Sequence, residues 1–583
     1  MPTFSNAPAC CAALEKTETL CISLLHLPVA LLNDIASWAV QLECGGALSL
    51  TCRAFSHANL LHAPTFCIEL DRQRCNQQLT PRVVTALQAR TGRLALTFEQ
   101  PRAQDSRRAL KLLGHILTKL GRCAAVQLCK LSRSAPTRPD LALDCPPSLA
   151  QRLLDSFPSL TALTIHGYSV TCSGLASLVS HPQLALQLQQ LDLTSTVIKE
   201  LKEPGPDAAA LSNLFQHAKL KQLSFDDYQG GVLPDLQPLA QHLTQLCVGQ
   251  FYETLSTFIS AVGALPQLQV LTASHWHHGG SIDLPQLLQA LPRLHTLQLP
   301  RTIVKGQGQL VELLAATQLT SVHVAGFMDL EESCAGLPCS WQRLEVTGIV
   351  NCTSAACLPL TSLTQPLVLG NLLVGHPSVS IPEVSAAVRN LTQACKAPVK
   401  IRVLQLSMPD SSGSDSMSDS SEESTDFDNP PSASAIWQQR VTLQQLVVVL
   451  KELHWIELVT VYAMLEASVE DVVVVAPLCQ GCTELRFMNC GLSPSLEFWR
   501  QPVQLMPTIS RVSFMSCTGV DTEAMCESLV LMAEQPWARW LYISIDITLY
   551  RYELPECCQA INSRFDHNLV SPAMFRVCFS VSD

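Results

Sequence analysis

The sequence predicts an α/β solenoid in which each repeat supplies one strand of a parallel sheet and one helix behind it. A short apolar pattern, L-x-x-L-x-L, recurs along most of the 583-residue chain. Eight consecutive copies have their central apolar positions between Leu163 and Leu344, and neighbouring central positions are 22 to 32 residues apart. The stretches between copies, such as 255–265 and 284–291, carry apolar residues at helical spacing. Because one unit cannot bury its apolar side alone, we expect the units to stack, with strands on the concave face and helices on the convex face.

The composition agrees with a leucine-rich solenoid. Hydrophobic residues make up 47% of the chain, but aromatic residues only 5% and charged residues only 15%, so Leu, Val, Ala and Cys must fill the core. The repeat length is close to the ~20–29 residues of leucine-rich repeats. The formal net charge is −11 and no dense run of Lys or Arg occurs, so we expect no nucleic-acid partner.

The amino terminus and the apolar runs favour a soluble, intracellular protein. Glu15, Lys16 and Glu18 precede the apolar stretch 20–32, which reverses the order of a secretory signal. The apolar run at 446–450 stops at Lys451, far short of the ~18 residues of a membrane span. We therefore expect no membrane partner and a location in the cytoplasm, the nucleus or both.

Neither the cysteines nor the short motifs predict a metal site, a cofactor or an enzyme. Cys479 and Cys482 form a C-x-x-C, half of a zinc site, but no second pair follows at a suitable spacing. The cluster His275, His277 and His278 is interpreted as a loop that leaves a strand, with a metal site as the alternative. Nucleophile-elbow, zinc-protease, P-loop and Rossmann patterns are absent from the sequence, so an enzyme is the weakest of the functional classes.

Two late repeats carry a finer pattern. Cys482-x-x-Leu485-x-Phe487 continues to Cys490, and Ile509-x-x-Val512-x-Phe514 continues to Cys517. This pattern resembles the cysteine-containing subclass of leucine-rich repeats, and the resemblance covers roughly residues 90–550. It implies that a buried cysteine closes the turn after each of these strands.

An acidic, serine-rich insertion interrupts one repeat. Leu404 and Ile456 are 52 residues apart, and removal of the 27 residues 408–434 leaves one ordinary repeat. The segment has seven acidic residues and is predicted to be disordered, because it cannot bury enough apolar surface. Four hydroxyl residues have an acid three positions later, as acidophilic kinases prefer: Ser412, Ser416, Ser420 and Thr425. One hypothesis is a phospho-regulated tether or a site for a basic partner, and the alternative is a solvated loop without function.

The amino-terminal region follows a different logic. It begins with Leu27-Pro28, continues with apolar residues on one helical face, and ends with a Leu-x-Leu-x-Cys-Arg-x-Phe stretch at 48–55. This order resembles the F-box, a small all-α module that docks on a Skp-type adaptor. The resemblance implies eleven adaptor-binding residues: Leu27, Pro28, Leu31, Leu32, Ile35, Trp38, Leu48, Leu50, Cys52, Arg53 and Phe55. The alternative is an apolar cap on the first repeat.

These observations divide the chain into a tail (1–19), an F-box-like module (20–64), leucine-rich repeats (65–407), the insertion (408–434), and further repeats with a carboxy-terminal cap (435–583). The F-box resemblance implies a non-catalytic substrate-recognition subunit of an SCF-type ubiquitin ligase. In that family the adaptor links to a cullin, and the repeats bind a protein substrate. The alternative is an interaction scaffold without a ubiquitin role, for example in the cytoskeleton or a cilium.

The repeat pattern also predicts the ligand face. Residues that flank the central and last apolar positions of each unit point out of the sheet toward the concave side. The substrate-binding candidates selected on this basis are Asp192, Asp226, Arg343, Glu345, Arg486, Met488, Arg511, Met515, Trp540 and Tyr542. Arg, Trp, Tyr and Met dominate interface hot spots. Trp540 and Tyr542 have an alternative place, packed under a cap formed by 545–583.

Overall fold

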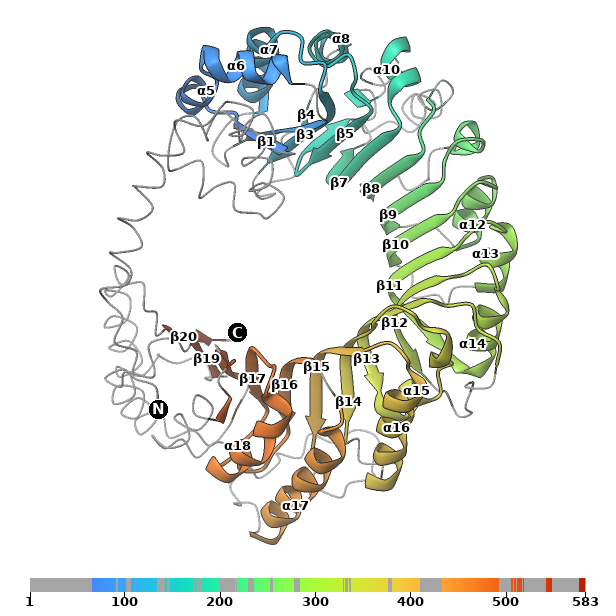
Figure 1. Ribbon diagram of the computed structural model, residues 1–583, viewed down its shortest axis with the longest axis vertical. Coiled ribbons are helices and arrows are strands. Elements are labelled where there is room, and N and C mark those ends of the chain that lie inside the picture. The colour runs from blue at the N-terminus through green and yellow to red at the C-terminus, as the bar shows by residue number, and fades with distance from the viewer. Residues whose placement is uncertain are drawn as a thin grey trace, which may run out of the picture. The chain divides into compact units, whose positions relative to one another are not determined.

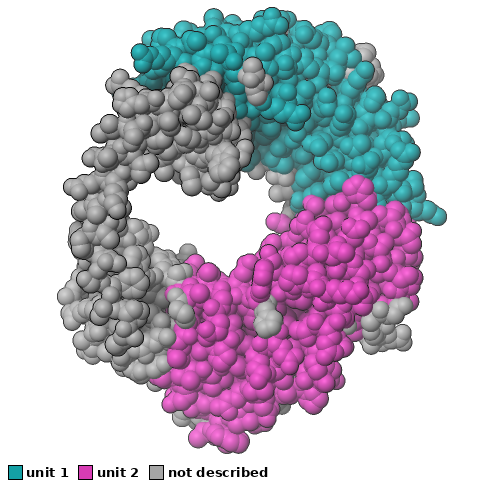
Figure 2. Space-filling model, viewed as in Figure 1, with its two compact units in different colours: residues 1–280, 286–294 teal, residues 281–285, 295–583 magenta. Residues whose placement is uncertain are grey.

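The computed structural model describes residues 65–133, 142–199, 215–276, 284–408, 433–491 and 505–517, with short gaps inside these ranges, and the strands 542–547 and 576–581 (Figure 1). The predicted F-box-like module lies outside these residues. The chain divides into two compact units. The first comprises residues 1–280 and 286–294, and the second comprises residues 281–285 and 295–583 (Figure 2).

Strands and helices alternate in the first unit, as the repeat pattern predicts. Its described elements are β1 (Thr65–Glu69), α5 (Arg72–Gln78), α6 (Pro81–Ala89), β2 (Leu94–Gln100), α7 (Ser106–Leu120), β3 (Val126–Arg133), β4 (Ala142–Leu143), α8 (Pro147–Ser156), β5 (Ala162–His166), β6 (Ser169–Thr171), α10 (Pro182–Gln187), β7 (Gln190–Lys199), β8 (Gln222–Tyr228), the 3-10 helix η1 (Gln237–Leu239), β9 (Gln245–Phe251), α12 (Leu255–Gly263) and β10 (Val270–Trp276). Helix α13 (Leu284–Ala290) follows at the division between the units.

The second unit continues the alternation. Its described elements are β11 (Thr296–Lys305), α14 (Gly306–Ala315), β12 (Ser321–Met328), β13 (Arg343–Asn351), α15 (Cys352–Ala356), η2 (Leu360–Ser362), β14 (Leu367–Val374), α16 (Ile381–Ala394), β15 (Val399–Ser407), α17 (Ala433–Leu450), β16 (Ile456–Tyr462), α18 (Val469–Val475), η3 (Ala476–Cys479), β17 (Glu484–Met488), β18 (Arg511–Met515), β19 (Tyr542–Ile547) and β20 (Arg576–Val581).

Within each unit the strands pair in parallel, and the apolar repeat positions lie in register. In the first unit Leu191 is paired with Leu223, which in turn is paired with Leu246 of the next strand. In the second unit Leu297, Val322 and Leu344 are aligned in the same way. All six side chains are buried. The central position of L-x-x-L-x-L therefore forms a continuous apolar row along the sheet, as predicted.

A recurring set of backbone hydrogen bonds fixes this register. It joins the residues at the start of one strand to the residue that precedes the neighbouring strand. The carbonyl oxygen of Gln189 accepts hydrogen bonds from the N–H groups of Lys221 and Gln222, at 2.7 and 3.0 Å. The Lys221 carbonyl accepts from Thr244 and Gln245 at 2.9 and 3.0 Å. Because the contact is made by backbone N–H groups, the two variable positions in L-x-x-L can carry different side chains, but a proline at either position would remove a donor.

The helices cover one face of the sheet and bury their apolar sides against it (Figure 1). On α14 the side chains of Leu310, Leu313 and Leu314 are buried, at the three- and four-residue spacing of one helix face. On α17 Leu443, Leu446 and Leu450 follow the same rule. The chain is thus an α/β leucine-rich-repeat solenoid with parallel strands. We call the sheet face opposite the helices the open face.

One strand is absent from the repeat copies predicted above. Strand β14 lies between β13 and β15. It carries the apolar pattern as Leu369-x-x-Leu372-x-Val374, in register with Ile401, Leu404 and Leu406 of β15, and all three side chains are buried. Sequence reasoning missed this copy.

The predicted insertion, residues 408–434, includes residues of the repeat at both of its ends. The Met408 side chain is 2% exposed, and its backbone N–H donates to the carbonyl oxygen of Tyr462 at 3.0 Å. Ala433 and Ser434 begin helix α17. Composition alone cannot locate these two ends. The Met408 backbone is bound by strand β16, which begins 48 residues later in the chain. Residues 409–432, which include the four candidate phosphosites, lie outside the described part. No helix within the described ranges is both long and apolar enough to cross a bilayer.

Candidate functional site: the open face of the second unit

Three rows of side chains cross the open face on strands β16, β17 and β18. The register places three residues in each row. The rows are Leu458, Glu484 and Arg511; then Thr460, Arg486 and Ser513; then Tyr462, Met488 and Met515. The alternating residues Val459, Leu485 and Val512 are fully buried toward the helices. The structure therefore places four predicted ligand-face residues, Arg486, Met488, Arg511 and Met515, on neighbouring strands.

Glu484 organises the charged part of this face. Its Oε1 accepts hydrogen bonds from Arg486 Nη2 at 2.9 Å and from Ser513 Oγ at 2.8 Å, and it lies 3.7 Å from Arg511 Nε. The Glu484 side chain is 13% exposed, whereas Arg486 and Arg511 are 27% and 43% exposed. The carboxylate is therefore largely covered, and the outer surface presents guanidinium groups.

A second cluster with the same plan lies on β13 and β15. Glu345 accepts from Arg343 Nη2 at 3.1 Å and from Arg402 Nη2 at 2.7 Å. The Glu345 side chain is 12% exposed and both arginines are 49% exposed. His323 pairs with Glu345 in the sheet register, and burial lowers the pKa of its imidazole, which favours the neutral ring.

Sequence reasoning missed Arg402. The repeat pattern selected the positions that flank Leu404 and Leu406, but Arg402 lies earlier in β15, directly after Ile401. Its guanidinium reaches Glu345 across the intervening strand β14. An arginine at the first variable position of the Ile401-x-x-Leu404 repeat was the available signal.

A buried cysteine follows each of the strands β17 and β18. Cys490 and Cys517 are buried, and their Sγ atoms donate to the carbonyl oxygens of Met488 and Met515 at 3.2 and 3.6 Å. A hydrogen bond between the two thiols, followed by burial, raises the pKa of Cys490. Each thiol closes the turn after its strand, as the resemblance implied.

Asn489 and Tyr462 extend the face at the carboxy ends of these strands. Asn489 has φ 51°, in the left-handed region that asparagine tolerates better than most residues. Its Nδ2 donates to the Tyr462 hydroxyl at 2.8 Å. The turn therefore holds the Tyr462 ring next to Met488, with which it is paired in register.

An exposed tryptophan, also missed by the sequence analysis, lies at the amino end of β16. Trp455 is 60% exposed and has φ 65°, which is unusual for a bulky residue. Lys400 Nζ lies 5.1 Å from the centre of its ring, within range of a cation–π contact. Trp455 borders a cavity of about 290 Å³ whose other walls include Cys395 and Glu452.

The remaining predicted ligand-face residues are not part of this cluster. Asp192 belongs to the first unit, where its Oδ1 accepts from the Thr194 hydroxyl at 2.8 Å and from the Thr194 N–H. Asp226 is in β8 and Tyr542 is in β19, opposite Arg511, but their side chains are not described. Trp540 and the eleven adaptor-binding residues lie outside the described part. The hypotheses about them therefore stay predictions.

The cysteine pair and the histidine cluster, both considered as metal ligands, lie on different repeats. Cys479 and Cys482 are buried, and Cys482 Sγ donates to the carbonyl oxygen of Ile456 at 3.2 Å. A hydrogen bond with Cys482 and burial raise the pKa of the Cys479 thiol. His275 is part of strand β10, not of the loop after it, while His277 and His278 are not described. Within the described ranges, no three His, Cys, Asp or Glu side chains gather as metal ligands would.

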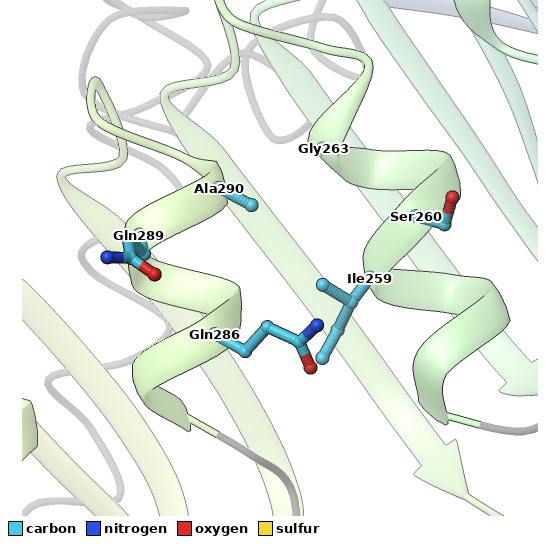
Figure 3. A pocket seen from close by; sticks show the side chains of 6 residues that line it. All are labelled: Ile259, Ser260, Gly263, Gln286, Gln289 and Ala290. Atoms are coloured by element: carbon cyan, nitrogen blue, oxygen red, sulfur yellow. The ribbon is translucent and has the colours of Figure 1, made fainter.

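A cavity of about 420 Å³ lies on the helix side of the first unit, between α12 and α13. Ile259 and Gln286 point toward one another across it (Figure 3). Its lining consists of Ile259, Ser260, Gly263, Gln286, Gln289 and Ala290. None of these six side chains titrates near neutral pH, so the lining supplies no general acid or base, and Ser260 has no basic side chain among the lining residues to activate it.

Comparison with known proteins adds two remote structural likenesses. No protein-family model matches the chain, and no curated protein matches it. The mouse RP105/MD-1 complex is similar at 13% identity over 82% of this chain and 71% of that chain, with a TM-score of 0.35. The yeast Rad7 and Elc1 complex is similar at 11% identity over 79% of this chain and 94% of that chain, with a TM-score of 0.34. At these scores neither likeness supports a functional conclusion.

Proposed function

We propose that the protein is a non-catalytic substrate-recognition subunit of an SCF-type ubiquitin ligase. The observation that carries this proposal is the F-box-like order of residues 27–55 directly before a leucine-rich-repeat solenoid. In this function the amino-terminal module docks on a Skp-type adaptor, which links to a cullin. The solenoid binds the protein substrate, and the chain itself makes no covalent bond to ubiquitin.

The open face suits protein binding because its side chains are held in place before a partner arrives. Successive parallel strands fix the rows of residues, and Glu484 and Glu345 each orient two arginines. Binding to side chains that are already ordered loses less conformational entropy. The face also combines arginine and methionine with Tyr462, residue types that are enriched in interface cores.

The decisive experiment is adaptor capture by the full chain. A purified Skp-type adaptor should co-elute with the protein, and Ile35→Asp should weaken the complex by roughly 2–5 kcal/mol, because it buries an unpaired charge in an apolar interface. Asn33→Asp adds the same charge on the other side of the predicted helix and serves as the matched control. Circular dichroism should show the same repeat fold in both variants.

Two outcomes would overturn the proposal. Either no adaptor co-elutes, or Ile35→Asp and Asn33→Asp retain equal amounts of it. In both cases the interaction scaffold becomes the better description, with residues 20–64 as a cap on the first repeat.

A further inference from the structure

We propose that the cavity between the connections 395–398 and 451–455 binds one large apolar side chain of a partner protein, next to an acidic residue of the same partner segment. The cavity has a volume of about 290 Å³ and lies where helices α16 and α17 lead into strands β15 and β16. Trp455 borders it and is the contact residue on which the inference depends. The inference goes beyond the proposed function, because it assigns a further binding site and holds whether or not an adaptor binds residues 20–64.

Trp455 combines a backbone conformation and an exposure that the fold alone does not favour. Its φ of 65° lies in the left-handed region, which is unfavourable for a residue with a Cβ atom and rare for a bulky one. The residue is nevertheless 60% exposed. Its carbonyl oxygen accepts a hydrogen bond from the Ile401 N–H at 3.0 Å, so the start of the neighbouring strand fixes its backbone. A strained residue that leaves a large ring in water is typical of a ligand contact.

Lys400 holds the ring in place. Its Nζ lies 5.1 Å from the centre of the Trp455 ring, within range of a cation–π contact. Lys400 is not among the residues that line the cavity, so its ammonium group and the cavity meet the ring at different places. The ring is therefore ordered before a partner arrives. An ammonium group already on the ring also makes a second cation an unfavourable occupant, because like charges repel.

The walls of the cavity select an apolar side chain. The Thr392 hydroxyl already has a partner, because it donates to the Val388 carbonyl oxygen at 3.0 Å. Burial raises the pKa of the Cys395 thiol, so the thiol stays neutral and behaves as a small apolar group. Glu452 is the one charged lining residue, and it is exposed at the mouth. The five apolar lining residues are Ala397, Pro398, Val399, Leu453 and Trp455.

The volume of the cavity fits a single side chain. Pockets for drug-sized ligands begin at about 300 Å³, so this cavity admits one residue and not a longer segment. The occupant is therefore one branched or aromatic apolar residue, which we call the anchor. The rest of the partner segment crosses the exposed mouth and meets the charged residues around it.

These charged residues determine what stands beside the anchor. The described charged residues of 395–402 and 451–457 are Lys396, Lys400, Arg402, Lys451, Glu452 and Glu457. Arg402 is already paired with Glu345, at 2.7 Å. Three lysines then remain against two glutamates, which leaves one positive charge in excess. One acidic residue beside the anchor matches this charge.

The test is fluorescence anisotropy with the full chain and a fluorescein-labelled peptide of seven residues. Its centre is leucine or phenylalanine, an aspartate stands on each side, and the other residues are glycine and serine. Trp455→Gly should weaken binding at least tenfold, because it removes the aromatic wall. Glycine adopts a φ of 65° without strain, so this variant should melt at the temperature of the original chain or higher.

Trp437→Ala is the matched control. This tryptophan is also exposed, by 68%, but it lies 13 residues before the end of α17, about 20 Å away along the helix from the end that adjoins the cavity. Its replacement removes an equal ring from the same unit. The affinity for the peptide should change by less than about twofold.

Peptides of changed composition test the anchor and its acidic neighbours separately. A glycine-centred peptide should bind at least tenfold more weakly than the leucine-centred one. A peptide with asparagine in place of the aspartates should bind about two- to fivefold more weakly, the effect of an exposed ion pair. The double variant Lys396→Gln and Lys451→Gln should abolish the difference between these two flanks.

Four results would overturn the inference. The first is no binding of either the leucine- or the phenylalanine-centred peptide at millimolar concentration, and the second is equal binding of the glycine-centred peptide. The third is a lysine-centred peptide that binds more tightly than the leucine-centred one. The fourth is a Trp455→Gly chain that binds the peptide like the original, which would leave the ring with a structural role only. Adaptor capture should be the same for Trp455→Gly and the original chain, because residue 455 lies outside 20–64.

Discussion

Replacement of Gln439 by methionine should loosen the loop that carries Tyr462 to the open face. Gln439 lies on α17 with a side chain that is 3% exposed. Its Oε1 accepts from the Leu465 N–H at 2.8 Å, and its Nε2 donates to the Ala463 carbonyl oxygen at 3.3 Å. Ala463 has φ 59°, a left-handed conformation that costs an alanine about 1 kcal/mol or more. The glutamine therefore holds a strained turn.

The expected cost follows from these two hydrogen bonds. Methionine keeps the size of the side chain but leaves one backbone N–H and one C=O without their partner, at about 1–3 kcal/mol each. We expect the local free energy of opening to fall by about 2–4 kcal/mol. By the factor of ten for each 1.4 kcal/mol, exchange of the Leu465 amide should accelerate at least about thirtyfold.

Hydrogen exchange followed by mass spectrometry over residues 462–467 measures this effect directly. Gln438→Met is the matched control, because Gln438 precedes Gln439 on the same helix and its side chain is exposed. Surface changes of this kind usually alter stability by less than about 0.5 kcal/mol. Unchanged protection in Gln439→Met, or an equal loss in Gln438→Met, would refute the reasoning that a buried amide maintains the turn.

Two further predictions concern a close backbone approach and a buried thiol. Gly370→Ala should lower the free energy of unfolding of the second unit by about 1–3 kcal/mol, because the added Cβ would collide with the Thr347 carbonyl oxygen. Gly308→Ala, which has open space around it on α14, should raise the same free energy by about 0.5–1 kcal/mol. Equal melting temperatures of the two variants would contradict this prediction. Burial raises the pKa of Cys129 from 9.0 to about 12. Folding thus favours the neutral thiol, and its contribution to stability is complete below pH 9 and lost as the pH rises toward about 12. Urea unfolding at pH 8 and at pH 10 should show a smaller loss in Cys129→Ala than in the original chain, and an identical loss in both would contradict the assignment.

The repeat architecture could be predicted from the sequence because each apolar position of the repeat has the same structural role in every copy. In L-x-x-L-x-L the leucines face the helices, so their spacing reports the strands directly, as Leu191 and Leu223 show. Strand β14 was missed although Leu369, Leu372 and Val374 have the same spacing and are paired with Ile401, Leu404 and Leu406. Leu367 of this strand is buried as well, so more than one apolar spacing fits the stretch and the pattern alone does not select the copy.

Only part of the candidate site could be predicted from the sequence. The period identified Arg343, Glu345, Arg486 and Arg511 as residues of the ligand face, because a strand alternates its side chains between two faces. It could not identify Arg402 as the partner of Glu345, since the two residues are 57 positions apart in sequence and meet across an intervening strand.

The sequence by itself determined the repeat, the parallel strands and the cysteine turns, because each of these depends on contacts within one repeat or between equivalent positions of adjacent repeats. Only the tertiary structure decided which charges pair, that Met408 belongs to the core, and that Trp455 is exposed beside Lys400. These outcomes depend on the register, on the length of each side chain and on what covers it. Such quantities arise when distant segments are brought together, and a one-dimensional pattern contains none of them.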